Sequence, residues 1–554
     1  MTLSPLNRLT NLLKLDKKDV YQVFFYAIFA GLVSLSLPLG IQAIINLIQS
    51  GRVSVSWIVL VFLVVAGVAL VGLLSLMQLR ITENLQQKIF IRSSFEFGYR
   101  LPKIKTEELY DQYPPELANR FFDTLTIQKG VSKLLVEFSA AILQILFGII
   151  LLSLYHSFFI FFGLFLIVLL YIIFRYSFES GLASSMKESK YKYKVVGWLQ
   201  EIARNNFSFK KNTNFDFALQ KNDKLTAEYL IYREKHFSVI KRQYTQLIFF
   251  KIIIAAGLLL IGGYLVLNQQ MNIGQFVAAE IIILLVIGSV EKIIVGLETL
   301  YDVLTAVEKI GQVTDMSVEE NSKEPLNYCY TNIQLVTEKM NYRFPDTTDP
   351  VLEKINLTID QSEKIYLEGL NGSGKTTLIR TLAGLLQPTS GAFYINDDTY
   401  QKIDLDQYRT HISTITTGET PFEGTILENI TFKNKMIKQE EIKWAIDSVK
   451  LGDYIKSLPE GLETKIYPEG KQLSSSNAQK ILLARSIINK PKILFYEDAL
   501  DKMDTDTAKE VIDFITSNEN KWTLIVSSKN SYWKDKCNRV ITMENGKIIN
   551  DLKK

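Results

Sequence analysis

The sequence predicts a multidomain membrane protein: an N-terminal six-helix transmembrane bundle with long cytosolic helical extensions, then an α/β domain around a phosphate-binding loop. Three observations predict this fold class. Six long apolar runs fill the first half, the composition turns polar near residue 322, and strand-like and helix-like segments then alternate. The chain has 554 residues, 47% hydrophobic and 22% charged, so it is long enough for a membrane part and a soluble part.

The apolar runs lie at about residues 20–48, 56–79, 134–155, 157–178, 246–267 and 273–300. Each exceeds the ~20 residues that a helix needs to cross a bilayer. Buried helices of a large soluble core are the alternative, and so many runs of this length disfavour it. We therefore predict a transmembrane domain at 1–310, a linker at 311–330 and a second domain at 331–554.

The loops between the runs predict the orientation. The loops at 80–133 and 179–245 are long and rich in Lys and Arg, whereas the others are short. Because positive charge stays on the cytoplasmic side, both long loops, both termini and the second domain should face the cytoplasm of an inner (plasma) membrane. Residues 119–123 and 214–217 are the expected turns that touch the second domain, with solvated helix surface as the alternative.

Composition and scattered charges limit the other classes of function. The net charge is only +4, which gives no case for a nucleic-acid partner. The two cysteines, Cys329 and Cys537, form neither a disulfide framework nor a metal set. Inside the apolar runs, Glu280 is the candidate for lining a pathway, while Lys251 and Glu291 lie toward the inner helix ends.

The strongest local motif is the phosphate-binding pattern G-x-x-x-x-G-K-[ST], which every fixed position fits. Its predicted nucleotide-binding residues are Gly369, Leu370, Asn371, Gly372, Ser373, Gly374, Lys375, Thr376 and Thr377. Residues 364–367 read as a strand entering the loop and 377–384 as the helix leaving it, so backbone N–H groups and a helix N-terminus should face phosphate. Lys375 would reach the outer phosphates, and the Thr376 hydroxyl would sit on Mg²⁺. An ordinary glycine-rich turn is the alternative.

Six apolar runs followed by this motif in one chain resemble a half-transporter of the ABC exporter family. The resemblance implies an ATP-binding α/β ATPase domain with a helical subdomain at 331–554, ATP and Mg²⁺ as cofactors, and a second half-transporter in a homodimer or heterodimer. It implies an exported substrate, which could be a peptide, a protein or a lipophilic compound. The layout around Leu37-Pro38-Leu39-Gly40 is similar to type I secretion and peptide-exporting members.

The resemblance assigns further positions, and several depart from the family pattern. Phe344 matches the aromatic that stacks on adenine, with a packed strand aromatic as the alternative. The loop glutamine falls on Thr417, and the switch histidine falls on Lys529. The signature that would face the partner's nucleotide reads Leu473 followed by Ser474, Ser475, Ser476 and Asn477, so both of its glycines are replaced.

The acidic strand end carries Glu497 and Asp498, where the family has Asp and then Glu. The resemblance makes Glu497 the carboxylate that holds Mg²⁺ through Thr376 and water, and it makes Asp498 the group that orients or deprotonates the attacking water. Asp498 is one methylene shorter than the family glutamate, and ~1 Å of misplacement can cost about a hundredfold in rate. The alternative is a charge that merely favours a helix N-terminus.

The binding positions are thus intact and the hydrolysis positions are altered, so we expect an ATP-driven exporter half-transporter with slow hydrolysis. Two rival readings remain. One is the ATP-binding regulatory half of a heterodimeric transporter, and the other is an assembly protein that uses the domain as an ATP-dependent clamp.

Overall fold

The computed structural model describes residues 4–49, 55–211, 216–319 and 332–554. The chain divides into two compact units. The first contains Met1–Lys103 and Gln112–Met316, and the second contains Ile104–Asp111 and Ser317–Lys554.

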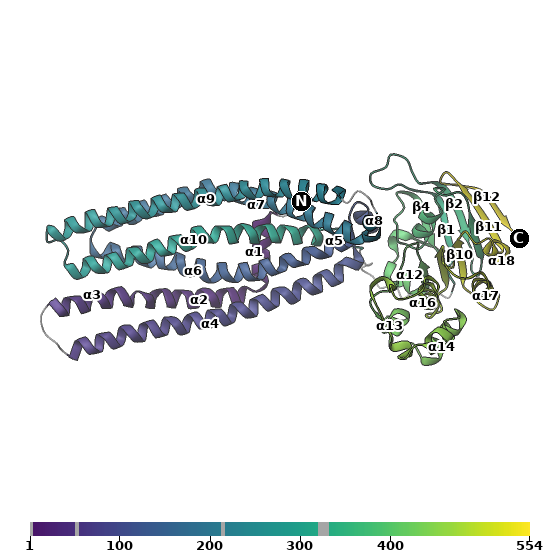
Figure 1. Cartoon of the computed structure of the whole chain (residues 1–554), viewed down its shortest axis with the longest axis horizontal. Coiled ribbons are helices and arrows are strands. Elements are labelled where there is room, and N and C mark those ends of the chain that lie inside the picture. The colour runs from purple at the N-terminus through teal and green to yellow at the C-terminus, as the bar shows by residue number, and fades with distance from the viewer. Residues whose placement is uncertain (1–3, 50–54, 212–215, 320–331) are drawn as a thin grey trace. The chain divides into compact units, whose positions relative to one another are not determined.

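The first unit consists of helices joined by short connections over its described residues (Figure 1). Its helices are α1 (Pro5–Leu15), α2 (Lys17–Ser34), α3 (Ser36–Gln49), α4 (Val55–Arg100), α5 (Pro114–Asn119), α6 (Asp123–Tyr155), α7 (Phe158–Arg204), α8 (Asn206–Lys211), α9 (Asp216–Leu267) and α10 (Ile273–Thr314). Helix α6 packs along α10, α7 along α9, and α2 along α4.

Six helical stretches among the described residues are long and apolar enough to cross a membrane, which confirms the predicted bundle. They are Lys17–Gln49, Val55–Lys103, Pro114–Tyr155, Phe158–Arg204, Asp216–Leu267 and Ile273–Thr314. Most exceed the predicted runs because polar helical extensions continue from the apolar part, as expected for the long loops.

The apolar faces that turn inward form two cores. One joins α6, α7, α9 and α10 around side chains such as Leu247, Ile254 and Val290, and the other joins α2, α4, α6 and α10. Lys251 on α9 pairs with Glu291 on α10, with 2.7 Å between Nζ and Oε2. An opposite charge therefore compensates each of these two groups. The pathway role of Glu280 stays a prediction.

The second unit is an α/β domain with two main sheets. A six-stranded sheet has the order β12-β11-β3-β10-β9-β6, and its neighbours are parallel except for β11 and β12. A four-stranded antiparallel sheet has the order β2-β1-β4-β5, and β7 pairs with β8. The strands are β1 (Leu335–Tyr342), β2 (Leu352–Ile359), β3 (Lys364–Glu368), β4 (Ser390–Ile395), β5 (Asp398–Thr399), β6 (Ile412–Ile415), β7 (Gly424–Thr425), β8 (Lys465–Ile466), β9 (Ile493–Glu497), β10 (Thr523–Ser527), β11 (Arg539–Glu544) and β12 (Lys547–Lys553).

The central strands β3, β9 and β10 are buried on both faces, which is why they read as continuous apolar runs. Successive side chains point to opposite faces of a strand. On β3, Tyr366 therefore joins one core, while Ile365 and Leu367 join the other. The two cores lie on the two sides of the same sheet, so the sheet holds the loops at its strand ends in fixed positions.

Helices cover both faces of this sheet. They are α11 (Lys375–Leu382), α12 (Leu405–His411), α13 (Ile426–Thr431), α14 (Gln439–Ser448), α15 (Gly452–Ser457), α16 (Ser475–Ile487), α17 (Thr505–Thr516) and α18 (Tyr532–Lys536). Residues of α13, α14 and α16 share a core with β9 and β10. These helices correspond to the predicted helical subdomain.

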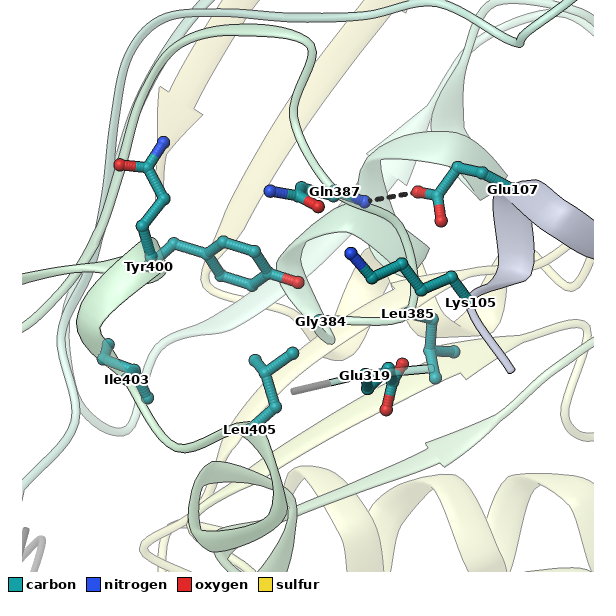
Figure 2. Close-up of a pocket in the computed structure, with 10 residues that line it drawn as sticks. Lys105, Glu107, Glu319, Gly384, Leu385, Gln387, Tyr400, Ile403 and Leu405 are labelled. Atoms are coloured by element: carbon teal, nitrogen blue, oxygen red, sulfur yellow. Dashed lines mark hydrogen bonds between the residues drawn. The ribbon is translucent and has the colours of Figure 1, made fainter. Parts of the chain in front are cut away.

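The short segment Ile104–Asp111 packs with the second unit, although it lies inside the range 1–310 assigned to the transmembrane domain. Ile104 forms a β-bridge with Val318, and the Glu107 carboxylate accepts a hydrogen bond from the Gln387 backbone N–H at 2.8 Å (Figure 2). Residues 119–123 belong to the first unit, and their expected contact with the second domain stays a prediction. Of the second expected turn, residues 214 and 215 lie outside the described part.

Candidate functional site

The phosphate-binding loop lies between β3 and α11, as the sequence predicts. Gly374 precedes α11 with φ 96°, a left-handed conformation that glycine adopts without a steric penalty. A Cβ atom on Gly369 would lie only 2.4 Å from the Met543 carbonyl oxygen. Both glycines are therefore required by the path of the chain, which leaves N–H groups at the start of α11 free to meet an anion.

The Lys375 side chain folds back over this loop. Its ammonium Nζ donates to the carbonyl oxygens of Gly369 at 2.8 Å and Leu370 at 2.9 Å. Partial burial lowers the pKa of Lys375, and the negative charge of Asp498 opposes that shift. The lysine therefore places a positive charge above the loop, where outer phosphates of a nucleotide would lie.

A cavity of about 480 Å³ opens beside the loop. Its lining brings together residues that are far apart in sequence, namely Lys375, Thr376 and Thr377 with Asp498, Ser528 and Lys529. Two of the altered positions, Asp498 and Lys529, thus share one cavity with the intact loop. Glu497 and Phe344 are not among its lining residues.

Glu497 ends strand β9 with only 2% of its surface exposed. The Arg380 guanidinium on α11 donates to both of its carboxylate oxygens, each at 3.2 Å. Thr417 adds two more hydrogen bonds to Oε2, from its N–H at 3.2 Å and its hydroxyl at 3.3 Å. The buried carboxylate is therefore already compensated by a cation and by the residue at the loop-glutamine position.

Asp498 follows the strand and turns away from Glu497. Its φ of 48° is left-handed, a region in which Asp is among the better tolerated residues. Its backbone N–H donates to the Ser527 carbonyl at 2.9 Å, and its own carbonyl accepts from the Gln479 side chain at 3.3 Å. Because of this turn, two adjacent acidic residues face different partners.

A second acid, Asp501, lies beside Asp498. Burial raises the pKa of Asp498, and the charge and hydrogen bond of Asp501 raise it further. Asp501 also accepts from the Ser528 hydroxyl at 2.6 Å and from the Lys529 N–H at 3.4 Å. Asp501 therefore acts on Asp498 in addition to Glu497, and the roles predicted for Glu497 and Asp498 stay predictions.

A neighbouring cavity of about 370 Å³ connects these acids with the signature helix. Its lining includes Thr417, Glu497, Asp498, Ser475 and Gln479. Asp498 and Lys529 line both cavities. Thr417, Asp498 and Lys529 therefore line one cavity.

The four predicted signature residues lie at the start of α16. The Ser474 hydroxyl accepts a hydrogen bond from the Asn477 N–H at 3.2 Å and so caps the helix. Ser475, Ser476 and Asn477 lie in the first turn, and none of the three has a positive φ. The helix start therefore tolerates side chains where the family has glycine.

Phe344 follows strand β1 and does not reach the phosphate cavity. Its ring stacks on Tyr110, with 4.9 Å between centroids and 24° between planes, and it meets Tyr342 edge-on at 5.1 Å. Burial raises the pKa of Tyr342 to about 12. The adenine-stacking role of Phe344 remains a prediction.

The oxygen groups near the loop fit Mg²⁺ in part. Thr376 and Asp498 line the cavity where phosphate oxygens and water would complete the shell that Mg²⁺ prefers. Glu497 does not line this cavity, and its carboxylate accepts hydrogen bonds from Arg380 and Thr417, so its role toward Mg²⁺ through Thr376 and water stays a prediction. No group of three His, Cys, Asp or Glu side chains suited to a metal was found over the described residues.

Sequence reasoning missed Arg380, Asp501, Gln479 and Tyr110. Asp501 and Gln479 carried a weak signal, because each lies within a few residues of a motif position. For Arg380 and Tyr110 no sequence pattern indicates the partner. Arg380 contacts Glu497, which lies 117 residues away, and Tyr110 contacts Phe344, which lies beyond the helices α5 to α10 along the chain.

Comparisons with known proteins agree with this geometry. Residues 352–501 match the family described as ABC transporter. The mesentericin-Y105 transport/processing ATP-binding protein MesD of Leuconostoc mesenteroides is 26% identical over 333 residues, which cover 59% of this chain and 46% of that protein. An ATP-dependent lipid A-core flippase of Thiobacillus denitrificans is 27% identical over 282 residues, which cover 50% of this chain and 48% of the flippase.

The chain spans just under half the length of the curated relatives that it matches. Over almost its whole length it superposes on a bacterial Atm1-family ABC exporter solved with ATP bound. The TM-score is 0.86 at 15% identity, and the match covers 97% of this chain and 95% of that one. Residues 352–501 therefore match the ABC transporter family, and the chain as a whole has the fold of a solved ABC exporter.

Proposed function

We propose that the chain is one half of an ATP-driven exporter in the inner (plasma) membrane. ATP binding would close two nucleotide-binding domains around nucleotide and switch the membrane helices from inward-facing to outward-facing. The observation that carries this proposal is the single cavity in which Lys375, Thr376, Asp498 and Lys529 meet. A loop of N–H groups, one movable ammonium and one carboxylate are what binding and cleaving a nucleoside triphosphate require.

The residues would act in sequence. The loop N–H groups would bind the phosphates, and the Lys375 ammonium would exchange the carbonyls of Gly369 and Leu370 for phosphate oxygens. Mg²⁺, when bound, would neutralise part of the phosphate charge from a position beside the Thr376 hydroxyl. Asp498, in its ionised form, would orient a water molecule toward the γ-phosphorus, so that ATP and water become ADP and phosphate.

Hydrolysis by this arrangement should be slow. Asp498 is shorter than the glutamate that the family uses. The neighbouring Asp501 raises the pKa of Asp498 and so favours the protonated form of Asp498. Thr417 donates two hydrogen bonds to Glu497. Because threonine has no carboxamide, this position offers no carboxamide that could align the water. Lys529 brings a fixed positive charge where an imidazole would alternate between donor and acceptor.

The partner of the proposed half-transporter is a second copy or a related half-transporter. Residues Ser474, Ser475, Ser476 and Asn477 of each chain would then face the nucleotide bound by the other chain. The substrate class stays open among a peptide, a protein and a lipophilic compound. The relatives themselves are named for different cargoes, including mesentericin and the lipid A core.

The test is ATP binding and phosphate release by the full-length chain in lipid vesicles. Lys375→Ala should weaken ATP binding by about ten- to a hundredfold, because hydrogen bonds to charged groups contribute roughly 1.5–3 kcal/mol. Lys456→Ala is the matched control, since this exposed lysine pairs with Asp453 in α15. Equal ATP affinity in the unmodified chain and Lys375→Ala would remove the loop as the nucleotide site.

Phosphate release separates the exporter from its main rival. The unmodified chain should release phosphate slowly but above the Lys375→Ala blank, and Asp498→Asn should fall to that blank. Tight ATP binding with no release above the blank would favour the regulatory half of a heterodimeric transporter. The complete compensation of Glu497 by Arg380 and Thr417 is the observation that speaks for this second candidate.

A further inference from the structure

The aromatic pair of Tyr110 and Phe344 is a contact that no motif explains. Tyr110 follows a short 3-10 helix at Thr106–Leu109, in the stretch that connects α4 to α5 along the chain. The two rings are nearly parallel, with centroids 4.9 Å apart. Stacked aromatic rings at this distance attract each other beyond the simple burial of surface.

The segment that carries Tyr110 is anchored by contacts other than the ring. The Lys105 N–H donates to the Ser317 carbonyl at 3.0 Å, and Glu107 accepts from the Gln387 N–H (Figure 2). The same stretch lines a cavity of about 180 Å³ together with Glu319, Gly384 and Tyr400. Tyr110 can therefore be altered without removing the segment from the domain.

Phe344 is separated from the phosphate cavity by a short loop. The chain runs from Phe344 through a short loop to Val351, which lines the phosphate cavity. The Val351 N–H donates to the Tyr342 carbonyl at 2.8 Å, which brings the end of this loop back beside the aromatic residues. A base attached to phosphates in the cavity would thus reach the Phe344 ring.

We propose that Tyr110 is a positioning residue for the nucleotide base. It covers one face of Phe344 and fixes the ring, so that the opposite face receives a purine. Tyr342 is almost fully buried and holds the pair from the strand side, whereas Tyr110 is about half exposed and holds it from the connecting segment. Base binding then depends on a residue that lies outside the nucleotide-binding domain in sequence.

This inference rests on the proposed binding of ATP, and its experiment keeps the two apart. Binding of ATP and of inorganic tripolyphosphate is measured on the full-length chain for Tyr110→Ala, Tyr110→Phe and Phe344→Ala. Tripolyphosphate has no base, so it reports on the phosphate loop alone. Glu108→Ala, a change to the exposed residue in the same short helix, is the control for disturbance of the segment.

Tyr110→Ala should weaken ATP binding by about two- to tenfold, the value of one stacked aromatic contact, and leave tripolyphosphate binding unchanged. Tyr110→Phe should bind ATP like the unmodified chain, because the ring is kept. Phe344→Ala should weaken ATP binding at least as much as Tyr110→Ala.

Tighter ATP binding by Tyr110→Ala would overturn the proposal, because Tyr110 would then occupy the place of the base. Unchanged ATP binding, or an equal loss for ATP and tripolyphosphate, would also overturn it. Failure of the proposed function looks different: the unmodified chain would bind neither ligand in a Lys375-dependent way.

Discussion

The phosphate-binding loop and the group of hydrolysis residues behind it lie in the same domain but are stabilised in different ways. In the loop, backbone geometry decides the arrangement: Gly374 has a left-handed φ, Gly369 passes close to Met543, and Lys375 binds carbonyls of the loop itself. In the second group, side chains hold one another. Glu497 binds Arg380 and Thr417, and Asp498 neighbours Asp501.

The difference teaches that altered motif positions need not leave unmatched polar groups. The Thr417 hydroxyl donates a hydrogen bond to Glu497, and the Ser474 hydroxyl caps the N-terminus of α16. Both hydroxyls take part in hydrogen bonds within the domain, so residues at these positions that differ from the family pattern do not have to weaken folding. Substitutions at Arg380, Asp501 and Thr417 test these side-chain contacts.

The largest effect is expected from the ion pair of Arg380 and Glu497, which should contribute to the free energy of unfolding. Arg380→Ala removes the cation beside the Glu497 carboxylate, which is only 2% exposed. Removing one partner of a fully buried ion pair lowers the free energy of unfolding by about 3–5 kcal/mol. Because the Arg380 side chain is 36% exposed, we expect about 2 kcal/mol, or a thermal midpoint lower by about 4–8 °C. Thermal unfolding of the purified full-length chain measures this loss.

The double variant Arg380→Ala with Glu497→Gln should recover most of the midpoint, since the uncompensated charge is then absent. Lys490→Ala breaks the exposed pair with Glu441 and should change little. An equal drop of the thermal midpoint in Lys490→Ala, or no recovery in the double variant, would show that the pair of Arg380 and Glu497 stabilises the domain no more than an exposed pair does.

The neighbouring acids should set the pH dependence of phosphate release. The pKa of Asp498 is raised, first by burial and then by Asp501, so the ionised form that orients water is lost at a higher pH than for an ordinary aspartate. Release should therefore rise with pH through this raised value. Asp501→Asn removes the neighbouring charge, so the acidic limb of the profile should move to lower pH, with ATP affinity unchanged.

The measurement is the pH profile of phosphate release with Lys375→Ala subtracted at each pH. Asp506→Asn is a suitable control, because this exposed acid lies in α17 outside the cavities. An acidic limb that stays in place in Asp501→Asn would separate Asp501 from the titration of Asp498.

The smallest effect is expected at Thr417. Thr417→Gln restores a carboxamide that can reach a water molecule, and we expect release to rise by about two- to tenfold. The gain should stay small because Asp498 and Lys529 are unchanged. Single-turnover phosphate release measures it, and Thr417→Val, which removes only the hydroxyl bond to Glu497, should give no gain. A faster phosphate release in both variants would mean that the gain comes from loss of the hydrogen bond to Glu497 and not from the carboxamide.

Much of the fold could be predicted because its signals are local. Apolar runs longer than ~20 residues predict the helices of the first unit, and the strand, loop and helix around Lys375 follow from glycine spacing. The paired charges could not be predicted. Arg380 reads as an ordinary helix residue until α11 and β9 are packed side by side, and residues 104–111 read as a membrane-domain loop until Ile104 pairs with Val318.

The sequence by itself determined the six membrane helices, the phosphate-binding loop and the identity of each altered motif position. Those features depend on hydrophobic length and on backbone conformations that only a few residue types adopt. Tertiary structure decided which side chains meet: Glu497 with Arg380, Asp498 with Asp501, and Phe344 with Tyr110. Segments that are far apart in sequence pack together, and this packing determines which residue pairs with a buried carboxylate or stacks on an aromatic ring. No local sequence pattern indicates such a partner.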